Sequence, residues 1–182
     1  MWWGIGYATL LVLLAVRFQD PNAPVRPTPP PQPGDPLRLV AVHHAVFYAL
    51  LLAAPLEAVV LGGTPVGRAA GLVVFAAGVA LYRAGARALG DSLSPFVQPV
   101  AGGALARTGP YRLLRHPMYL GQALIAVGAP LTLGAWRSLG LSLVALAVLV
   151  VRGRREEAAL RRAFADYDAY ARRTKRIVPY VF

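Results

Sequence analysis

The sequence predicts an all-α integral membrane bundle of about five transmembrane helices, followed by a cytoplasmic amphipathic helix. Three observations support this: 57% of the 182 residues are hydrophobic, only 15% are charged, and five long apolar runs follow one another. Soluble domains are usually less apolar and about a quarter charged. We therefore expect a lipid bilayer to be the solvent for most of the chain.

The five apolar runs define the expected helices of a single membrane domain, residues 1–182. They are residues 1–16, 39–61, 64–82, 117–136 and 139–151. At 1.5 Å per residue, the second, third and fourth reach roughly 35, 28 and 30 Å, close to the thickness of the hydrocarbon layer. The first and fifth are shorter, at roughly 24 and 20 Å, so the fifth is expected to continue as a helix from Arg152 to Arg173. The first run lacks a basic start and a small-residue cleavage site, and is predicted to be a retained helix rather than a signal peptide.

The segments between and after these helices have distinct compositions. Residues 17–38 hold half of the 16 prolines and are predicted to form a stiff linker. Residues 83–116 are expected to form a cytoplasmic loop, and residues 152–182 a cytoplasmic helix and tail. Within that tail, apolar residues recur at helical spacing at Leu160, Phe164, Tyr167 and Ala171. This amphipathic segment is expected to lie along the membrane or to pack under the bundle.

The distribution of charge predicts the orientation of the bundle. The chain has 19 Lys and Arg against 8 Asp and Glu. With five spans, every basic residue except Arg68 and Arg137 lies on the same side of the membrane. The positive-inside rule places that side in the cytoplasm and the N-terminus outside, as for a multi-pass protein of the inner or plasma membrane. The same rule explains the positive charge without nucleic acid as a partner.

Several residue types narrow the chemistry. The sequence contains no cysteine, which excludes thiolate nucleophiles and sulfur-ligated metals. His43 and His44 are adjacent, so they point about 100° apart on a helix and are expected to make buried or interfacial hydrogen bonds rather than to share a metal. No metal site is predicted. Glu57 lies in an apolar run and is therefore a functional candidate, although Arg68 is a possible ion-pair partner for it.

The most informative stretch is Thr108-Gly-Pro-Tyr-Arg-Leu-Leu-Arg-His-Pro-Met-Tyr-Leu-Gly121. Gly109-Pro110 favours a turn, and Pro117 suits the first turn of the fourth helix. The free amides at that helix start favour an anionic group. A second constellation, Arg152-x-x-x-Glu156-Glu157, lies on the same side of the membrane. On physical grounds alone, the favoured interpretation is that His116 and Tyr119 anchor the helix at the interface.

Taken together, these two motifs resemble those of the isoprenylcysteine carboxyl methyltransferase family, which is similar in turn to the phospholipid methyltransferases. The resemblance covers residues from about Gln98 to Pro179 and implies a membrane enzyme that binds S-adenosylmethionine on the cytosolic side. It implies contact with this cofactor for nine residues: Gln98, Ala104, Leu105, Tyr111, His116, Pro117, Met118, Tyr119 and Glu156. By the same resemblance, Arg152 corresponds to an arginine that faces the substrate.

The residue types agree with methyl transfer to a lipophilic small molecule or a lipid-modified group. A carboxylate acceptor needs no strong base, and Arg152 is suited to hold it in a bidentate contact. An amine, phenol or thiol acceptor must lose a proton, for which Glu157, His116 or a tyrosine is a possible base. Two other functions remain open: an NADPH-dependent membrane reductase of the sterol-reductase type, and a noncatalytic scaffold that binds anionic lipid. The acceptor and the oligomeric state are not predicted.

Overall fold

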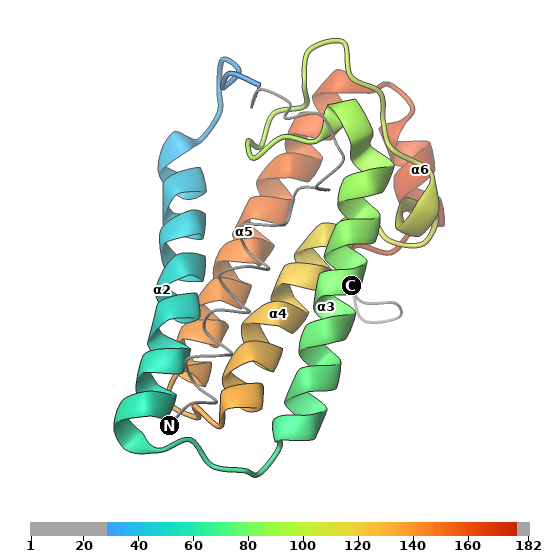
Figure 1. The fold of residues 1–182 in the computed structure, drawn as a ribbon. Coiled ribbons are helices and arrows are strands. Elements are labelled where there is room, and N and C mark those ends of the chain that lie inside the picture. Colours follow the sequence, from blue (N-terminus) through green and yellow to red (C-terminus); the bar gives the residue numbers. More distant parts are fainter. Residues whose placement is uncertain (1–28, 178–182) are drawn as a thin grey trace.

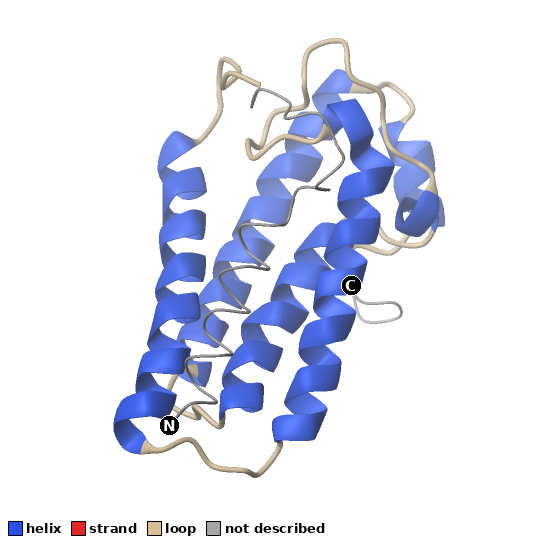
Figure 2. Ribbon diagram, viewed as in Figure 1, coloured by secondary structure: helices blue, strands red, loops and turns tan. Residues whose placement is uncertain are grey.

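The computed structural model describes residues 29–177, and within them the fold is entirely helical (Figure 2). The first predicted helix, residues 1–16, and most of the proline-rich linker lie outside the described residues. The α-helices are α2 (Leu37–Leu61), α3 (Arg68–Leu89), α4 (Pro117–Leu133), α5 (Leu139–Ala163) and α6 (Tyr167–Arg173). Two short 3₁₀ helices, η1 (Gly90–Ser92) and η2 (Gly109–Arg112), lie in the connection between α3 and α4.

Four long helices run up and down alongside one another (Figure 1). The start of α2, the end of α3, the start of α4 and the end of α5 all lie toward one end of the bundle, which we call the loop end. The α3–α4 connection and α6 cover this end. Helix α4 is at the centre, because its residues contribute to each of the three buried apolar clusters: Ile125 and Ala129, Ala126, and Leu133.

The surface of the bundle is apolar, as expected for a membrane protein. Large hydrophobic side chains are exposed along α2, α3 and α5, among them Leu52, Val60, Val73 and Leu143. Among the described residues, α2 and the segment Arg68–Ser92 are long and apolar enough to cross a membrane, and α4 is a shorter apolar helix. Helix α5 combines an apolar first half with a charged second half.

The second to fifth predicted helices are present among the described residues, and their ends differ for local reasons. Helix α3 begins after a turn at residues 64–67, later than predicted, and continues to Leu89, where Gly90 adopts a φ of +53°. Helix α4 ends at Gly134, which adopts the left-handed conformation. The prediction of one continuous helix from Arg152 to Arg173 is wrong: α5 ends at Ala163, Phe164 is extended, and α6 begins at Tyr167.

Helices α3 and α4 pack backbone to backbone through a ladder of glycines. The glycines recur every seven residues, at Gly71, Gly78 and Gly85 on α3 and at Gly121 and Gly128 on α4. A Cβ added at Gly78 would lie 2.8 Å from the carbonyl oxygen of Gly121, and one at Gly121 would lie 2.7 Å from the amide of Tyr82. The small residues therefore allow a helix contact within one chain that larger side chains would prevent.

This contact predicts that even one methyl group at Gly121 is destabilising. Gly121→Ala places a carbon against the backbone of α3, and we expect it to lower the free energy of unfolding by about 1–3 kcal/mol. Gly140→Ala is the matched control, because nothing lies within 4 Å of the added carbon, and it should be neutral or stabilising by up to about 1 kcal/mol. Thermal unfolding in detergent, followed by circular dichroism, compares the two; equal effects would contradict the packing described here.

Candidate active site

A cavity opens at the loop end, between the α3–α4 connection, the end of α5 and α6. It comprises about 680 Å³ of atom-free space including its mouth, of which about 90 Å³ is wide enough for the centre of a water molecule. At about 90 Å³ the cavity is a narrow cleft, smaller than the roughly 300–1,000 Å³ of typical small-molecule sites, so a ligand of that size requires its walls to move apart. Its walls are formed by Leu89, Ser92, Ser94, Phe96, Val97, Gln98, Pro99, Val100, Gly103, Ala104, Leu105, Ala106, Tyr111, Arg115, Glu156, Leu160, Phe164, Tyr167 and Tyr170.

The apolar face of the tail forms one wall of this cavity. Leu160, Phe164 and Tyr167, which recur at helical spacing in the sequence, all line it. The tail segment therefore packs under the bundle, one of the two alternatives left open by the sequence. Tyr170 secures the opposite wall, because its hydroxyl donates a hydrogen bond of 2.9 Å to the carbonyl oxygen of Tyr111.

The carboxylate of Glu157 joins three segments beneath the cavity. Its side chain is 1% exposed and accepts hydrogen bonds from Arg115 Nε (2.9 Å) and from Arg176 Nε and Nη2 (2.9 and 2.7 Å). His116 Nε2 lies 3.3 Å from the same carboxylate. Backbone bonds reinforce the junction, since the amides of Arg115 and His116 donate to the carbonyl oxygens of Lys175 and Arg176. Glu157, which lies on α5, thus attaches both the loop before α4 and the chain after α6 to this helix.

These contacts set the protonation state of Glu157. Burial alone would raise its pKa, but the hydrogen bonds from His116, Arg176 and Arg115 outweigh burial and hold the pKa well below the ordinary value of 4.5. A carboxylate that remains ionised so firmly is a weak base. The geometry therefore favours a structural role over the predicted role as a catalytic base.

Glu156, the neighbouring acid, lies on a different face of α5 and lines the cavity. The hydroxyl of Tyr119 donates a hydrogen bond to Glu156 Oε2 and accepts one of 2.8 Å from Arg152 Nε. The guanidinium of Arg152 lies 5.8 Å from the centre of the Tyr119 ring. Tyr119 therefore connects Arg152 and Glu156, which are one helical turn apart, and orients the acid toward the cavity.

Arg152 lies deep in the bundle at 3% exposure. Besides Tyr119, it donates to His43 Nδ1 at 2.7 Å and to the carbonyl oxygen of Pro95. A bidentate contact with an acceptor carboxylate would require Arg152 to release some of these partners. Its present contacts are those of a residue that holds α2, α4, α5 and the α3–α4 connection together.

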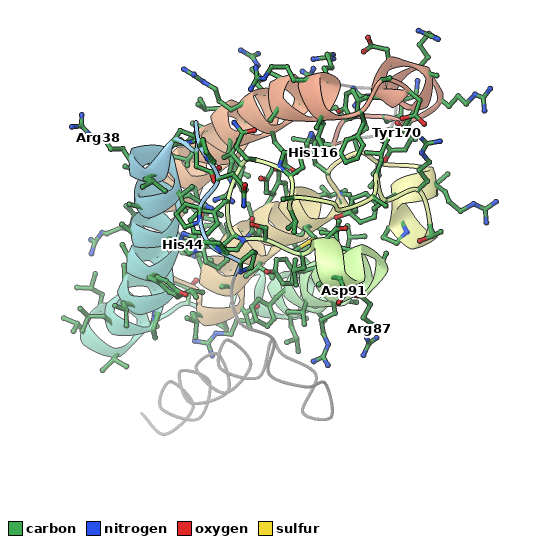
Figure 3. The ribbon with its side chains drawn as sticks, turned by 90° about the horizontal axis from the view of Figure 1, so that it is seen from above. Arg38, His44, Arg87, Asp91, His116 and Tyr170 are labelled. Atoms are coloured by element: carbon green, nitrogen blue, oxygen red, sulfur yellow. The ribbon has the colours of Figure 1, made fainter. Side chains whose placement is uncertain are left out.

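The predicted site residues fall into two groups. Gln98, Ala104, Leu105, Tyr111 and Glu156 line the cavity. The residues at the start of α4 lie outside its lining: His116, Pro117, Met118 and Tyr119. Tyr119 is connected to the lining through its hydrogen bond to Glu156. His116 is 3% exposed and stacks on the Tyr119 ring with centroids 5.2 Å apart. Figure 3, looking down on the loop end, shows His116 inside the bundle while Arg38 and Arg87 point outward.

Burial also affects the phenol of Tyr111. Removal from water, and secondarily the Glu156 carboxylate, raise its pKa far above the ordinary value of 10. A phenol with so high a pKa stays protonated at neutral pH. Tyr111 is therefore a hydrogen-bond donor and an apolar wall for a ligand rather than a proton acceptor.

Asp35 holds part of the cavity wall, a role that the sequence did not indicate. Its Oδ1 accepts hydrogen bonds from the amides of Val97 (3.0 Å) and Gln98 (2.8 Å), both cavity residues more than 60 positions away. Its Oδ2 accepts from the amide of Gln32. Asp35 thus holds the wall of the cavity against the segment that precedes α2. No local pattern signals such a contact, because the two segments meet only in the folded chain.

Two expectations about polar residues in the apolar runs are now resolved. His43 is buried and hydrogen-bonded to Arg152, and His44 Nδ1 lies 2.8 Å from the carbonyl oxygen of Val40, as expected for histidines in hydrogen-bonding roles. The suggested Glu57–Arg68 ion pair is wrong. Glu57 instead accepts hydrogen bonds from the amides of Arg137 and Ser138 and from the Ser138 hydroxyl, at the start of α5.

Residues 29–177 form an all-helical bundle with membrane-length apolar helices, which is the architecture of a membrane-associated protein. A family model for the phospholipid methyltransferases matches residues 66–167. This match covers more than half of the chain, and the protein belongs to that family. The resemblance to the related isoprenylcysteine carboxyl methyltransferases is thereby confirmed at the level of the wider group. A comparison with curated proteins finds no match.

The Glu157 junction predicts a pH-dependent contribution to stability. The folded-state pKa lies below 4.5, so the contribution is complete above that pH and is lost as the pH falls toward the depressed value. Because Glu157→Gln leaves buried cations with a neutral partner, we expect it to lower the free energy of unfolding by about 3 kcal/mol at pH 7. The difference from wild type should narrow below pH 4.5.

Thermal unfolding between pH 7 and pH 3 measures this difference. Asp168→Asn is the control, because Asp168 pairs with Arg161 at 65% exposure, and its removal should change stability by no more than about 0.5 kcal/mol. A loss in Glu157→Gln that is the same at every pH would show that the ionised carboxylate is not what joins these segments.

Proposed function

We propose that the protein is an S-adenosylmethionine-dependent methyltransferase that acts on a lipophilic or lipid-modified acceptor. The observation that carries this proposal is the convergence of Glu156, Gln98 and Tyr111 on one narrow cavity in a chain of the phospholipid methyltransferase family. When bound, the cofactor supplies an electrophilic methyl group on a positively charged sulfur.

The side chains around the cavity fit such a cofactor. Glu156 uses Oε2 to accept from Tyr119, which leaves Oε1 for the hydroxyl or ammonium groups of a ligand. Phe96 and Phe164 offer aromatic surfaces to a flat base. The hydroxyl of Tyr167 is buried in the wall and has no hydrogen-bond partner among the described residues, so a ligand atom can satisfy it.

The chain's own part in the reaction is alignment and exclusion of water. Methyl transfer from a sulfonium is an in-line displacement in which positive charge disappears, so a fixed geometry and a dry site lower the barrier. Arg152 and Tyr119 hold Glu156 in one orientation, and Asp35 fixes the Val97–Gln98 wall. Arg152 therefore acts as a positioning residue in this proposal. A carboxylate acceptor, and thus formation of a methyl ester, requires it to exchange one of its protein contacts.

We further propose that the bundle spans the membrane several times with the loop end in the cytoplasm. The end of α5, which carries the exposed Arg154, Arg155 and Arg162, lies at the loop end, whereas Arg68 begins α3 and Arg137 precedes α5 at the other end (Figure 1). A cytoplasmic loop end gives the cavity access to a soluble, charged cofactor. The membrane helices beside it allow a hydrophobic acceptor to enter from the bilayer.

Isothermal titration of the detergent-solubilised protein with S-adenosylmethionine tests the proposal. We expect saturable binding to the wild type and binding about 10- to 100-fold weaker in Glu156→Gln, because a charge-assisted hydrogen bond to the ligand is lost. Asp168→Asn, which removes an exposed acid from the same end of the molecule, should bind like the wild type.

The same experiment separates the rival functions. Displacement of the methyl donor by NADPH at equal concentration would favour a reductase. An absence of saturable binding in the folded wild type would rule out the proposal. Binding only to anionic vesicles, weakened by salt and unaffected in Glu156→Gln, would favour a lipid-binding scaffold.

A further inference from the structure

The cavity at the loop end is narrower than a ligand of the size of S-adenosylmethionine requires. About 90 Å³ of it is wide enough for the centre of a water molecule, against roughly 300–1,000 Å³ in typical small-molecule sites. Part of its lining must therefore move outward when such a ligand binds. The hydrogen bonds and ion pairs of the walls indicate which part moves and what holds it in place.

One stretch of the lining, residues 99–107, lies between two fixed points, and we call it the outer wall. Before it, Asp35 accepts hydrogen bonds from the amides of Val97 and Gln98, and after it Tyr170 donates to the carbonyl oxygen of Tyr111. The outer-wall residues that line the cavity are Pro99, Val100, Gly103, Ala104, Leu105 and Ala106. The outer wall is thus a connection that is secured at both of its ends.

Between these fixed points, side chains hold the outer wall by two contacts in the part of the chain that the structure describes. Ser92 Oγ donates to the carbonyl oxygen of Ala104 at 3.4 Å, and Arg107 forms an ion pair with Asp166. Asp166 immediately precedes Tyr167, which lines the cavity from the side of the tail. Within residues 29–177, the ion pair is therefore the one hydrogen-bonded contact between the outer wall and the tail.

This ion pair is exposed, which limits its strength. The side chains of Arg107 and Asp166 are 48% and 59% exposed. The hydrogen bond from Arg107 lowers the pKa of the Asp166 carboxyl, so the acid is ionised at neutral pH. Water and salt screen such a pair, and removal of an exposed pair typically changes an equilibrium by about 1.5- to 5-fold. An interaction of this size favours the closed arrangement of the walls and still allows it to open.

We propose that the Arg107–Asp166 ion pair is a latch that holds the empty cavity narrow and opens when a ligand enters. The latch itself stands on the contacts between the outer wall and the tail. Its effect on S-adenosylmethionine rests on the proposed function. Because the ion pair stabilises only the closed arrangement, it competes with the ligand, and its loss should raise the affinity for the ligand.

Labelling of a buried thiol measures the opening without any ligand. Val97 lines the cavity at 3% exposure and the chain contains no cysteine, so Val97→Cys carries one thiol that a maleimide reaches when the walls separate. Adding Asp166→Asn should speed its labelling about 1.5- to 5-fold, since the rate follows the population of the open form. The control thiol is Ala159→Cys, at a position buried to 2% exposure outside the cavity lining, and its labelling should not change. An unchanged rate at position 97, or equal acceleration at both positions, would overturn the proposal.

Titration with S-adenosylmethionine measures the effect of the latch on binding. Asp166→Asn should bind about 1.5- to 5-fold more tightly than the wild type, and the difference should shrink as salt is raised to about 1 M. Asp168→Asn is the matched control, because this exposed acid pairs with Arg161 on the same side of the cavity, and it should bind like the wild type. In an Arg107→Gln background, Asp166→Asn should have no further effect. Equal or weaker binding by Asp166→Asn, or an effect that persists without Arg107, would contradict the latch.

A covalent lock provides a test with a larger effect. In Arg107→Cys/Asp166→Cys, a short reducible cross-linker between the two thiols should weaken S-adenosylmethionine binding at least tenfold, and reduction should restore it. The same cross-linker in Arg161→Cys/Asp168→Cys, which joins two positions on the side of the tail, should leave binding unchanged. Full affinity with the lock closed would overturn the proposal.

The two kinds of measurement separate the latch from the proposed function. Failure of the wild type to bind S-adenosylmethionine, together with faster labelling of Val97→Cys when Asp166 is neutralised, would contradict the proposed function and leave the latch standing. Normal binding of the cofactor without that faster labelling would contradict the latch alone.

Discussion

The buried carboxylate of Glu157 is the constraint on which the loop end depends. An ionised group at 1% exposure is stable only if cations and hydrogen-bond donors surround it, and the chain brings these from the loop before α4 and from the segment after α6. Satisfying this one charge therefore holds two segments, the loop before α4 and the chain after α6, against the end of α5. Its neighbour Glu156 then faces the cavity, where Tyr119 fixes its orientation. The two acids of the motif have different tasks: one assembles the site and the other is available to a ligand.

The glycine ladder between α3 and α4 has a similar role in the membrane part of the molecule. Close approach of these two helices brings Gly85 near the end of α3 against Pro117 and Met118 at the start of α4. Asp35 secures the loop that follows α3 from the side of α2. Polar contacts made by Arg152 continue this connection into the bundle. The long helices thus provide a rigid frame for a cavity lined largely by loop residues. A few specific contacts hold these loop residues to the frame.

The sequence predicted the features that depend on local pattern. Apolar runs located α2 to α5, and the proline at position 117 marked the start of α4. Of the predicted cofactor contacts that line the cavity, Tyr111 and Glu156 lie in the two motifs, and the family resemblance added Gln98, Ala104 and Leu105. Features that depend on distant contacts were missed, such as the contacts of Asp35 with Val97 and of Glu57 with Ser138, because a local pattern does not identify the distant partner of an acid. The break at Phe164 was also missed, since the helical spacing of apolar residues continues across it. The seven-residue spacing of the glycines, in contrast, is visible in the sequence and could have predicted the α3–α4 pairing.

The central claim is that the cavity at the loop end is the methyl-donor site. Protection of single cysteines by the cofactor tests this claim most directly. The chain contains no cysteine, so Ala104→Cys in the cavity wall and Ala101→Cys outside the lining each provide one reactive thiol. The rate of maleimide labelling is measured with and without S-adenosylmethionine. The account predicts that the cofactor slows labelling at position 104 at least tenfold and leaves position 101 unchanged. Equal rates at position 104 with and without a saturating concentration of the cofactor would contradict it.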